Sequence, residues 1–497
     1  MSRHEPFKPT CSGVQPLTPR LEPWMRGLLT GARLETLVKQ YGSPLNIQSS
    51  EPFKRNLSDL NKVAQKRGLK FNPFFARKAN KCLSYIDAAH ALGCGIDTAS
   101  LAEVEQVLQR GVPGSDIVCT AAVKTRDLLQ LCVDNGVTII IDNADELDLL
   151  SMIAADAGRR ARIGLRLCGF KHEENILHSR FGFPLCDLHA LVARCEEQAD
   201  NFNLIGLHFH LNGYDANHRV SALRQVIPVA TELKKSGGPS FFIDIGGGIP
   251  MRYLEQSTQW DDWCQAHGEA LLGAREPITR DNHGIGRLVH EGKILGTVDA
   301  YPPNHPCVQQ DWLASILDAP LDAPCLDADN GDATIAQTLV AADLELRCEP
   351  GRSVLYGCGM TVAAVQFRKR DSQGNLVVGV TMNSTQCRTG FKEFMLDPLL
   401  VPKAEDRQPT DSAEGYLAGT YCTESEWLSL RKMRFPMGVS VGDLIVFANT
   451  AGYLMHFRES RSHQFDLAKN IFQSDETGPD SFVLDDIDGQ GCTTLLA

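Results

Sequence analysis

A lysine stands at the end of an apolar segment, in the stretch FFARKANK at residues 74–81. If this segment is a strand, Phe74, Ala76 and Lys78 point to one face, because side chains alternate along a strand. Burying an ammonium group costs free energy unless the site needs it. A desolvated lysine has a lowered pKa and can form a Schiff base with an aldehyde. Lys78 is therefore a candidate nucleophile, although a strand-end lysine that reaches solvent is the alternative and Lys81 is a competing candidate.

Two other segments contain the residue types that bind an anion. DIGGGIP, at residues 244–250, has three consecutive glycines after an apolar run, so backbone N–H groups could close on a phosphate. It lacks the spacing of a Walker loop. CEPGR, at residues 348–352, places Glu349 and Arg352 on either side of a Pro–Gly turn, where Arg352 could pair with a phosphate. Turn geometry explains the glycines equally well, and a surface turn with an incidental ion pair would explain CEPGR.

Histidine and cysteine residues offer two further candidate sites. In GLHFHLNG, at residues 206–213, the rings of His208 and His210 would share one face of a strand and could bind a metal. The sequence provides no convincing third ligand and no metal is expected, so stacking on a flat cofactor and core packing are the alternatives. Cys422, in TYCTESEW at residues 420–427, could donate a proton or could be an ordinary packed cysteine.

The elements that would position these residues follow a repeated pattern. Between about residues 45 and 250, apolar strand-like segments alternate with helical ones; the strand candidates are PLNIQ, FNPFFAR, GCGID, DIVCT, TIIID, RIGLRLC, LIGLHFHL and FFIDIGGG. Continuous apolar strands between helices favour a parallel sheet covered by helices. Seven or eight such units predict an α/β fold of the (β/α)8 TIM-barrel type, with a doubly wound sheet as the alternative. In a barrel, an inward lysine at the carboxyl end of a strand lies where active sites are built.

The pattern changes after residue 356. TVAAVQFRKRDSQGNLVVGVTM and GDLIVFANTAGYLMHF read as strand pairs, which predicts a C-terminal antiparallel β-barrel or sandwich. We therefore predict residues 1–45 to be a tail and a segment packing on the β domain, residues 46–356 to be the barrel, and residues 357–497 to be the β domain. Residues 253–335, approximately, exceed the length of a barrel connection and are predicted to be an insertion.

Composition limits the function classes. The chain has 497 residues and a net charge of −12, which argues against binding to nucleic acid or to an anionic membrane surface. No apolar run reaches the length of about 18 residues that a membrane helix needs, and the first residues lack the pattern of a signal peptide. The 16 cysteines are scattered singly, which is typical of a reduced, cytoplasmic protein.

The order of these segments resembles the pyridoxal-phosphate-dependent ornithine, diaminopimelate and arginine decarboxylases, which have an alanine-racemase-like fold (fold type III). The resemblance extends over roughly residues 30–460, outside the insertion. FFARKANK resembles the family's YAVKAN, GCGIDTASLAEVE resembles its G-x-G-F-D-x-x-S-x-x-E segment, and SRFGF resembles its KFG element. The resemblance implies pyridoxal 5'-phosphate as the cofactor, with Lys78, and not Lys81, as the lysine that forms the Schiff base.

The resemblance also assigns roles to individual residues. His210 falls on the ring-stacking histidine, Glu349 on the carboxylate facing the pyridine nitrogen, and Cys422 on a β-domain residue that completes the partner subunit's site. The implied catalytic residues are Lys78, His210, Glu349 and Cys422. The implied cofactor-binding positions are Lys78, Asp97, Arg166, His210, Gly213, Gly246, Gly247, Gly248, Glu349, Arg352 and Tyr453.

The family predicts an amino-acid substrate, loss of CO2 and an obligate homodimer. An acid at Glu349 favours decarboxylation, since a partner that leaves the pyridine nitrogen unprotonated would give a poorer electron sink, better suited to racemisation. An amino-acid racemase or epimerase and a non-catalytic relative are the alternative functions. Gly213 stands where the family has a phosphate-binding serine, and Thr423 where it commonly has an acid. These departures predict a divergent branch whose substrate and reacting stereocentre the sequence leaves open.

Overall fold

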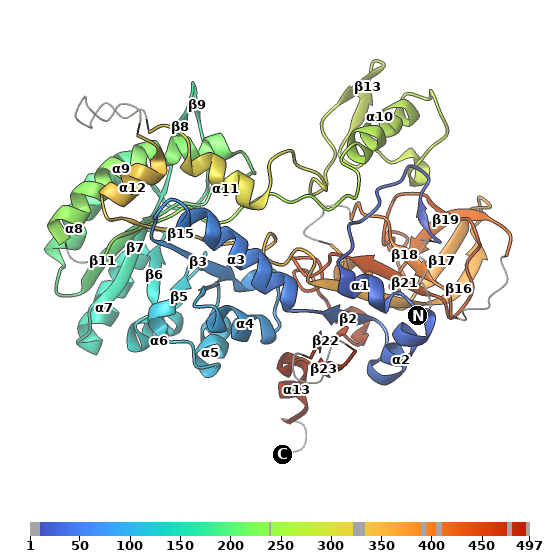
Figure 1. Ribbon diagram of the computed structural model, residues 1–497, viewed down its shortest axis with the longest axis horizontal. Helices are drawn as coiled ribbons and strands as arrows, with labels where there is room; N and C mark the ends of the chain where they lie inside the picture. Colours follow the sequence, from blue (N-terminus) through green and yellow to red (C-terminus); the bar gives the residue numbers. More distant parts are fainter. Residues whose placement is uncertain are drawn as a thin grey trace.

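Eight parallel strands close into a barrel that forms one of the two lobes of the molecule (Figure 1). The closing pair joins β6 to β7. In barrel order the strands are β3 Phe71–Ala76, β4 Gly95–Thr98, β5 Ile117–Cys119, β6 Thr138–Ile141, β7 Ala161–Cys168, β11 Phe202–His208, β12 Phe242–Asp244 and β15 Glu345–Cys348. The computed structural model describes residues 10–237, 240–321, 333–388, 394–403, 410–474 and 480–493. The predicted tail up to residue 9 and the part of the predicted insertion at 322–332 lie outside these residues.

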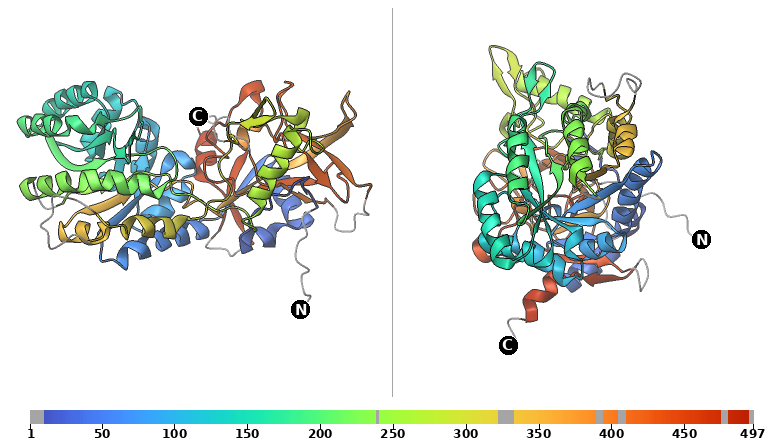
Figure 2. Two further views of the ribbon diagram at one scale, coloured as in Figure 1. Left: turned by 90° about the horizontal axis from the view of Figure 1, so that it is seen from above. Right: turned by 90° about the vertical axis from the view of Figure 1, so that its left-hand side faces the viewer.

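Helices surround the barrel strands, as the second view of Figure 2 shows. They are α3 Glu51–Gln65, α4 Ser84–Ala91, α5 Leu101–Gln109, α6 Arg126–Asn135, α7 Ala144–Ala157, α8 Leu188–Glu197, α9 Ala216–Gly237, α11 Gln309–Leu317 and α12 Ile335–Ala341. Local signals set several of the ends: the side chains of Ser100, Thr125 and Asn143 cap α5, α6 and α7, and Gly136 ends α6 in the left-handed conformation.

The prediction that PLNIQ is a barrel strand is wrong. This segment forms β2, Leu45–Gln48, which pairs antiparallel with β16 (Gly359–Arg370) and parallel with β22 (Lys469–Gln473) of the other lobe. All four residues of β2 are buried, so its composition is equally suited to either sheet. The eighth barrel strand is instead β15, which lies between β12 and β3 and leads directly into Glu349.

The second lobe is a ten-stranded sheet domain. Besides β2, β16 and β22 it contains β1 Ser12–Gly13, β17 Leu376–Val380, β18 Leu399–Val401, β19 Ala413–Ala418, β20 Met433–Phe435, β21 Leu444–Ala448 and β23 Phe482–Leu484. Most neighbours are antiparallel, as predicted, but β17 pairs parallel with β19 and β2 parallel with β22. Three helices, α1 Pro23–Leu28, α2 Gly31–Tyr41 and α13 Asp486–Thr493, flank this sheet domain (Figure 1). A barrel with a separate sheet domain is the fold class that the sequence predicted.

The segment between β12 and α11 packs on the sheet domain. It contains α10, Gln259–Leu271, and the hairpin of β13, Leu288–His290, and β14, Lys293–Leu295 (Figure 1). Trp263 and Ile285 belong to the same buried cluster as Val365 and Phe447 of the sheet domain. Helix α11 then returns to the barrel, where Trp312 is buried in the barrel core. The insertion therefore links the two lobes beside the mouth of the barrel.

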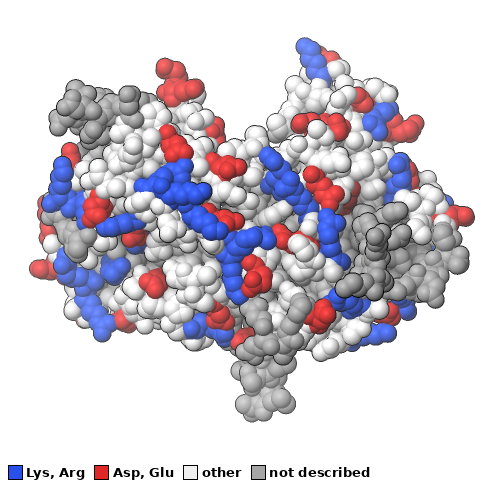
Figure 3. All heavy atoms as spheres, in the orientation of Figure 1, with Lys and Arg blue, Asp and Glu red and all other residues white. Residues whose placement is uncertain are grey.

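The surface carries charges of both signs. On the face shown in Figure 3, Lys and Arg are interspersed with Asp and Glu. Some form ion pairs, such as Arg67 with Asp318 at 2.5 Å and Lys62 with Asp59 at 2.8 Å. Across the described ranges, none of the helices combines the length and the apolar character needed to cross a membrane.

Candidate active site

Lys78 lies in a turn just beyond its strand. Strand β3 ends at Ala76, and residues Arg77–Ala79 form one turn of 3-10 helix, so the predicted strand alternation does not extend to the lysine. The buried guanidinium of Arg77 holds this turn, because it donates to the carbonyls of Asn80 and Lys81 and, at 3.0 Å, to Gln106 Oε1. Arg77, which had no role in the sequence interpretation, thus fixes the turn that presents Lys78.

The charge of Lys78 is balanced by acids. Its Nζ lies 3.0 Å from Asp97 Oδ2, and Thr120 donates to Asp97 Oδ1 at 2.5 Å. Burial lowers the pKa of Lys78, but Asp97 and Glu349 outweigh burial and hold that pKa above its ordinary value. The expectation of a lowered pKa is therefore wrong for the protein without cofactor. Burial raises the pKa of Asp97 to about 6, against the opposing effect of Lys78.

Lys81 belongs to a different set of contacts. Its ammonium group pairs with Glu459 of the sheet domain, and its backbone N–H donates to His456 Nδ1 at 3.3 Å. The other ring nitrogen of His456 lies 2.8 Å from Asn470 Oδ1, so the neutral ring with its proton on Nε2 satisfies both partners. Burial, together with the charge of Lys81, lowers the pKa of His456 to about 3.

This histidine gives a testable pH dependence. The folded pKa of His456 lies below the ordinary value of 6.5, so between about pH 6.5 and 3 only the unfolded chain binds its proton. Its stabilising contribution is therefore complete above pH 6.5 and declines as the pH falls. We expect the difference in unfolding free energy between the wild type and His456→Asn to shrink by about 1 kcal/mol from pH 7 to pH 5.5. The same scans of His189→Asn, at an exposed site on α8, are the control for replacing a histidine by asparagine. Parallel curves for His456→Asn would contradict the assignment.

The barrel mouth contains a cavity of about 470 Å³. Eight of the predicted site residues line it: Lys78, His210, Gly213, Gly247, Gly248, Glu349, Arg352 and Tyr453. The other lining residues were not predicted as site residues from the sequence; they are Leu211, Asn212, Tyr214, Ile249, Tyr301, Gly351, Ser353 and Phe457. Ser353 directly follows EPGR, so its position in the sequence could have indicated it. Tyr301 lies in the insertion, and no local signal connects it with the barrel.

The triple glycine packs closely behind His210. Gly246 has φ +66°, and a Cβ on it would lie 2.6 Å from His210 Nδ1. The N–H of Gly247 donates to that same nitrogen at 3.1 Å, so the ring is neutral with its proton on Nε2. Burial lowers the pKa of His210 to about 3, which keeps the ring uncharged near neutral pH. His210 follows the end of β11 and lines the cavity, as a ring-stacking residue would.

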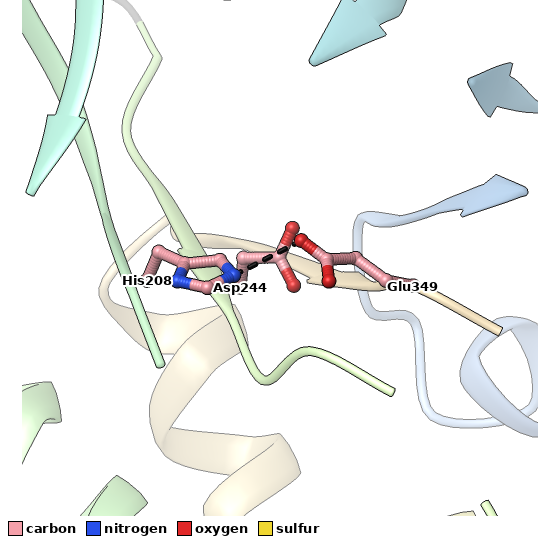
Figure 4. A group of neighbouring side chains, drawn as sticks. All are labelled: His208, Asp244 and Glu349. Atoms are coloured by element: carbon pink, nitrogen blue, oxygen red, sulfur yellow. Dashed lines mark hydrogen bonds and ion pairs between the residues drawn. The ribbon is translucent and has the colours of Figure 1, made fainter. Parts of the chain in front are cut away.

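Glu349 is held by a buried group of side chains. His208 Nε2 lies 2.9 Å from Glu349 Oε1, and Asp244 lies beside both (Figure 4). Among the described residues, these three also lie close enough together for metal coordination, within 4.8 Å. Burial, reinforced by the charge of Glu349, raises the pKa of the neighbouring Asp244 carboxyl.

The cation of Arg352 lies among aromatic rings. Its guanidinium lies 4.0 Å from the ring centre of Tyr301 and 5.2 Å from that of Tyr453, and it donates to the carbonyl of Gly452 at 3.0 Å. The backbone of Tyr453 is joined to the lysine turn, since its N–H donates to the carbonyl of Ala79 at 2.8 Å. Barrel, insertion and sheet domain therefore all contribute to the cavity wall.

Four predicted residues do not line the cavity. Asp97 lies behind Lys78 and Gly246 behind His210, each in contact with a lining residue. Arg166, on β7, is 3.7 Å from Asp142 and packs over the ring of Phe181. Cys422 is exposed on the sheet domain, with its Sγ 3.3 Å from His463 Nε2.

The cavity fits pyridoxal phosphate. Lys78 offers an amine for the aldehyde, and Glu349 offers a buried carboxylate for the pyridine nitrogen. Gly248, the last of the three glycines, and Arg352 offer a backbone N–H group and a cation for the phosphate. The hydroxyl of Ser353 is a further donor, because it is buried with no hydrogen-bond partner in the described chain.

Comparisons with known proteins agree with this reading. Residues 53–284 match the family described as "Pyridoxal-dependent decarboxylase, pyridoxal binding domain". An uncharacterised protein, y4yA, of Sinorhizobium fredii is 31% identical over 478 residues, which cover 95% of this chain and 97% of that protein. Diaminopimelate decarboxylase of Archaeoglobus fulgidus is 28% identical over 46% of this chain and 56% of its own length.

A comparison of folds finds similar solved structures. A crystal structure of diaminopimelate decarboxylase from Methanocaldococcus jannaschii superposes with a TM-score of 0.65, 17% identity and 94% coverage of each chain. The cofactor that follows from the pyridoxal-binding match is pyridoxal phosphate. The chain belongs to the family of pyridoxal-phosphate-dependent ornithine, diaminopimelate and arginine decarboxylases.

Proposed function

We propose that this protein is an amino-acid decarboxylase, which replaces the carboxylate on the α-carbon by a proton and releases CO2. Bound pyridoxal phosphate supplies a sink for the electron pair that remains on the α-carbon when CO2 leaves. The observation that carries the proposal is Glu349, a buried carboxylate that lines the cavity and is hydrogen-bonded by His208. Its negative charge stabilises a protonated pyridine nitrogen, which decarboxylation needs more than racemisation does.

The other residues bind and orient. Lys78 would hold the cofactor through its amine, which the amine of the substrate would replace. His210 supports the ring with a neutral imidazole. Gly248 and Arg352 would hold the phosphate, which would keep the reacting end of the cofactor beside Lys78.

A proton must reach the α-carbon after CO2 leaves. Lys78 is one candidate donor, because it lies in the cavity. Cys422 is the other, and because it is exposed outside this cavity, we propose that it serves the site of a second subunit in a homodimer. None of the described cysteines forms a disulfide, which supports a reducing compartment such as the cytoplasm.

The shared site can be tested by mixing inactive variants. We expect Lys78→Ala and Cys422→Ala each to have little activity. Co-refolded or co-expressed in equal amounts, they should recover about a quarter of wild-type CO2 release, because half of the dimers are mixed and each has one intact site. Each variant treated alone in the same way is the control. A mixture no more active than the average of its components would contradict sites built from two subunits.

The proposed reaction is tested by CO2 release from a panel of L- and D-amino acids, with ornithine, lysine, arginine and meso-diaminopimelate among them. Release from one compound, with the matching amine as product, would establish decarboxylation and identify the stereocentre. If solvent deuterium enters the α-carbon without CO2 release, the enzyme is a racemase or epimerase. If protein that binds the cofactor catalyses neither reaction across the panel, decarboxylation of these amino acids is wrong.

A further inference from the structure

Arg219 is a buried cation that the reaction described above does not use. It lies on α9 beside the barrel mouth and has no exposed surface. Its guanidinium stacks over Trp312 at 5.4 Å. Among the described residues, no carboxylate lies within ion-pair distance of it, and its Nε has no hydrogen-bond partner. Burial lowers the pKa of Arg219, and Asp215 opposes this effect only through its charge, without an ion pair. A buried charge without a paired counter-charge is costly, so such an arginine points to an anion.

The hydrogen bonds of Arg219 go to backbone carbonyls. Its Nη1 donates to the carbonyl of Asp215, just before its own helix, at 3.3 Å, and its Nη2 donates to carbonyls of the two loops that form one side of the cavity. Its Nη2 donates to the carbonyls of Leu211 at 2.9 Å and Gly213 at 2.8 Å, and more weakly to that of Gly247 at 3.4 Å. The first two belong to the loop after His210 and the third to the triple glycine. One side chain therefore joins the two loops.

These contacts set the direction of three N–H groups. In a planar trans peptide, the carbonyl of one residue and the N–H of the next point in opposite directions. Peptides whose carbonyls face Arg219 consequently direct the N–H groups of Asn212, Tyr214 and Gly248 away from it. All three residues line the cavity. None of these N–H groups donates to an acceptor within the described ranges.

Gly248 lines the cavity and packs directly against this cation. It has φ +84°, and a Cβ on it would lie 2.4 Å from Arg219 Nη2 and 3.0 Å from the carbonyl of Gly213. Only a glycine lets the guanidinium approach the cavity wall so closely. The wall between Arg219 and the cavity is thus a single layer of backbone.

We propose that Arg219 is the organising residue and the buried counter-charge of the cofactor's phosphate site. It orients the N–H groups of Asn212, Tyr214 and Gly248 toward the phosphate, and the phosphate in turn balances its charge. This explains how the phosphate site can form although Gly213 has no side-chain hydroxyl to donate. Arg219 acts through the two loops, so it is a positioning residue. The proposal rests on the cofactor alone, and its failure would leave the CO2 test unaffected.

The test compares two aldehydes that differ only in the phosphate. Cofactor-free protein is titrated with pyridoxal phosphate and with pyridoxal, and binding is followed by quenching of tryptophan fluorescence. We expect Arg219→Gln to weaken pyridoxal phosphate binding about tenfold to hundredfold. Pyridoxal binding should change less than about threefold, because it makes no use of the phosphate site. Arg219→Lys should lie between this variant and the wild type, since an ammonium group keeps the charge but loses the planar fork.

The control is Arg224→Gln. This half-buried arginine on the same helix donates to the carbonyl of Pro320, away from the cavity. It should leave both affinities unchanged. Inorganic phosphate, at constant ionic strength, should also raise the melting temperature of cofactor-free wild type more than that of Arg219→Gln. Equal losses for the two aldehydes, or no loss, would overturn the proposal in favour of a merely structural arginine. If Arg219→Gln does not fold, the test uses Arg219→Lys. The proposal is then overturned if the ratio of the affinities for pyridoxal phosphate and pyridoxal is the same in Arg219→Lys as in the wild type.

Discussion

Replacing Lys78 by alanine should remove the visible absorbance of the bound cofactor and lower CO2 release by at least about a thousandfold. The reason is geometric, because Lys78 is the lysine that lines the cavity. The change also leaves Asp97 buried without its ammonium partner, so that acid should take up a proton more readily. The measurement is an absorbance spectrum of purified protein with added pyridoxal phosphate, followed by the CO2 assay.

Lys81→Gln is the matched control. Lys81 is only three residues away, but its ammonium group contacts Glu459 and does not line the cavity. Glutamine can still donate a hydrogen bond to that carboxylate, so the fold should be kept. We expect this variant to retain the cofactor spectrum. If Lys78→Ala kept the spectrum and Lys81→Gln lost it, the assignment of the two lysines would have to be exchanged.

Glu349→Gln should leave the cofactor bound but reduce CO2 release about a hundredfold to ten thousandfold. Glutamine preserves the shape of the side chain, and its oxygen can still accept from His208. It lacks the negative charge that stabilises a protonated pyridine nitrogen. The effect should therefore appear in kcat, with little change in the affinity for the cofactor.

Glu345→Gln controls for a charge change on the same strand. Glu345 begins β15 at the opposite end of the barrel, where it pairs with Arg347 at 2.5 Å. Since barrel active sites occupy the carboxyl ends of the strands, activity should stay within about twofold of the wild type. If Glu349→Gln were as active as this control, the carboxylate would not be needed, and the argument for decarboxylation over racemisation would lose its basis.

Several features were determined by the sequence alone, because their signals are local. Continuous apolar segments between helices predicted the barrel strands from FNPFFAR to FFIDIGGG, and Gly136 ended its helix through a backbone conformation that glycine adopts without strain. The triple glycine and EPGR indicated a phosphate site because close backbone approach and a nearby cation need those residue types. The order of these segments was enough to predict the family, the cofactor and the fold class.

Other features were decided only by the tertiary structure, because they depend on residues that are distant in sequence. The composition of β2 suits a barrel strand equally well. It belongs to the other lobe because it pairs with β16 and β22, and these partners lie more than 300 residues away in the sequence. The pKa of Lys78 follows from Asp97 and Glu349, which approach it through space, and electrostatic interaction depends on distance in space rather than along the chain. No pattern in the sequence distinguishes Arg219 from an ordinary arginine on a surface helix. Its role emerges only where folding brings two glycine loops against it and leaves its charge buried.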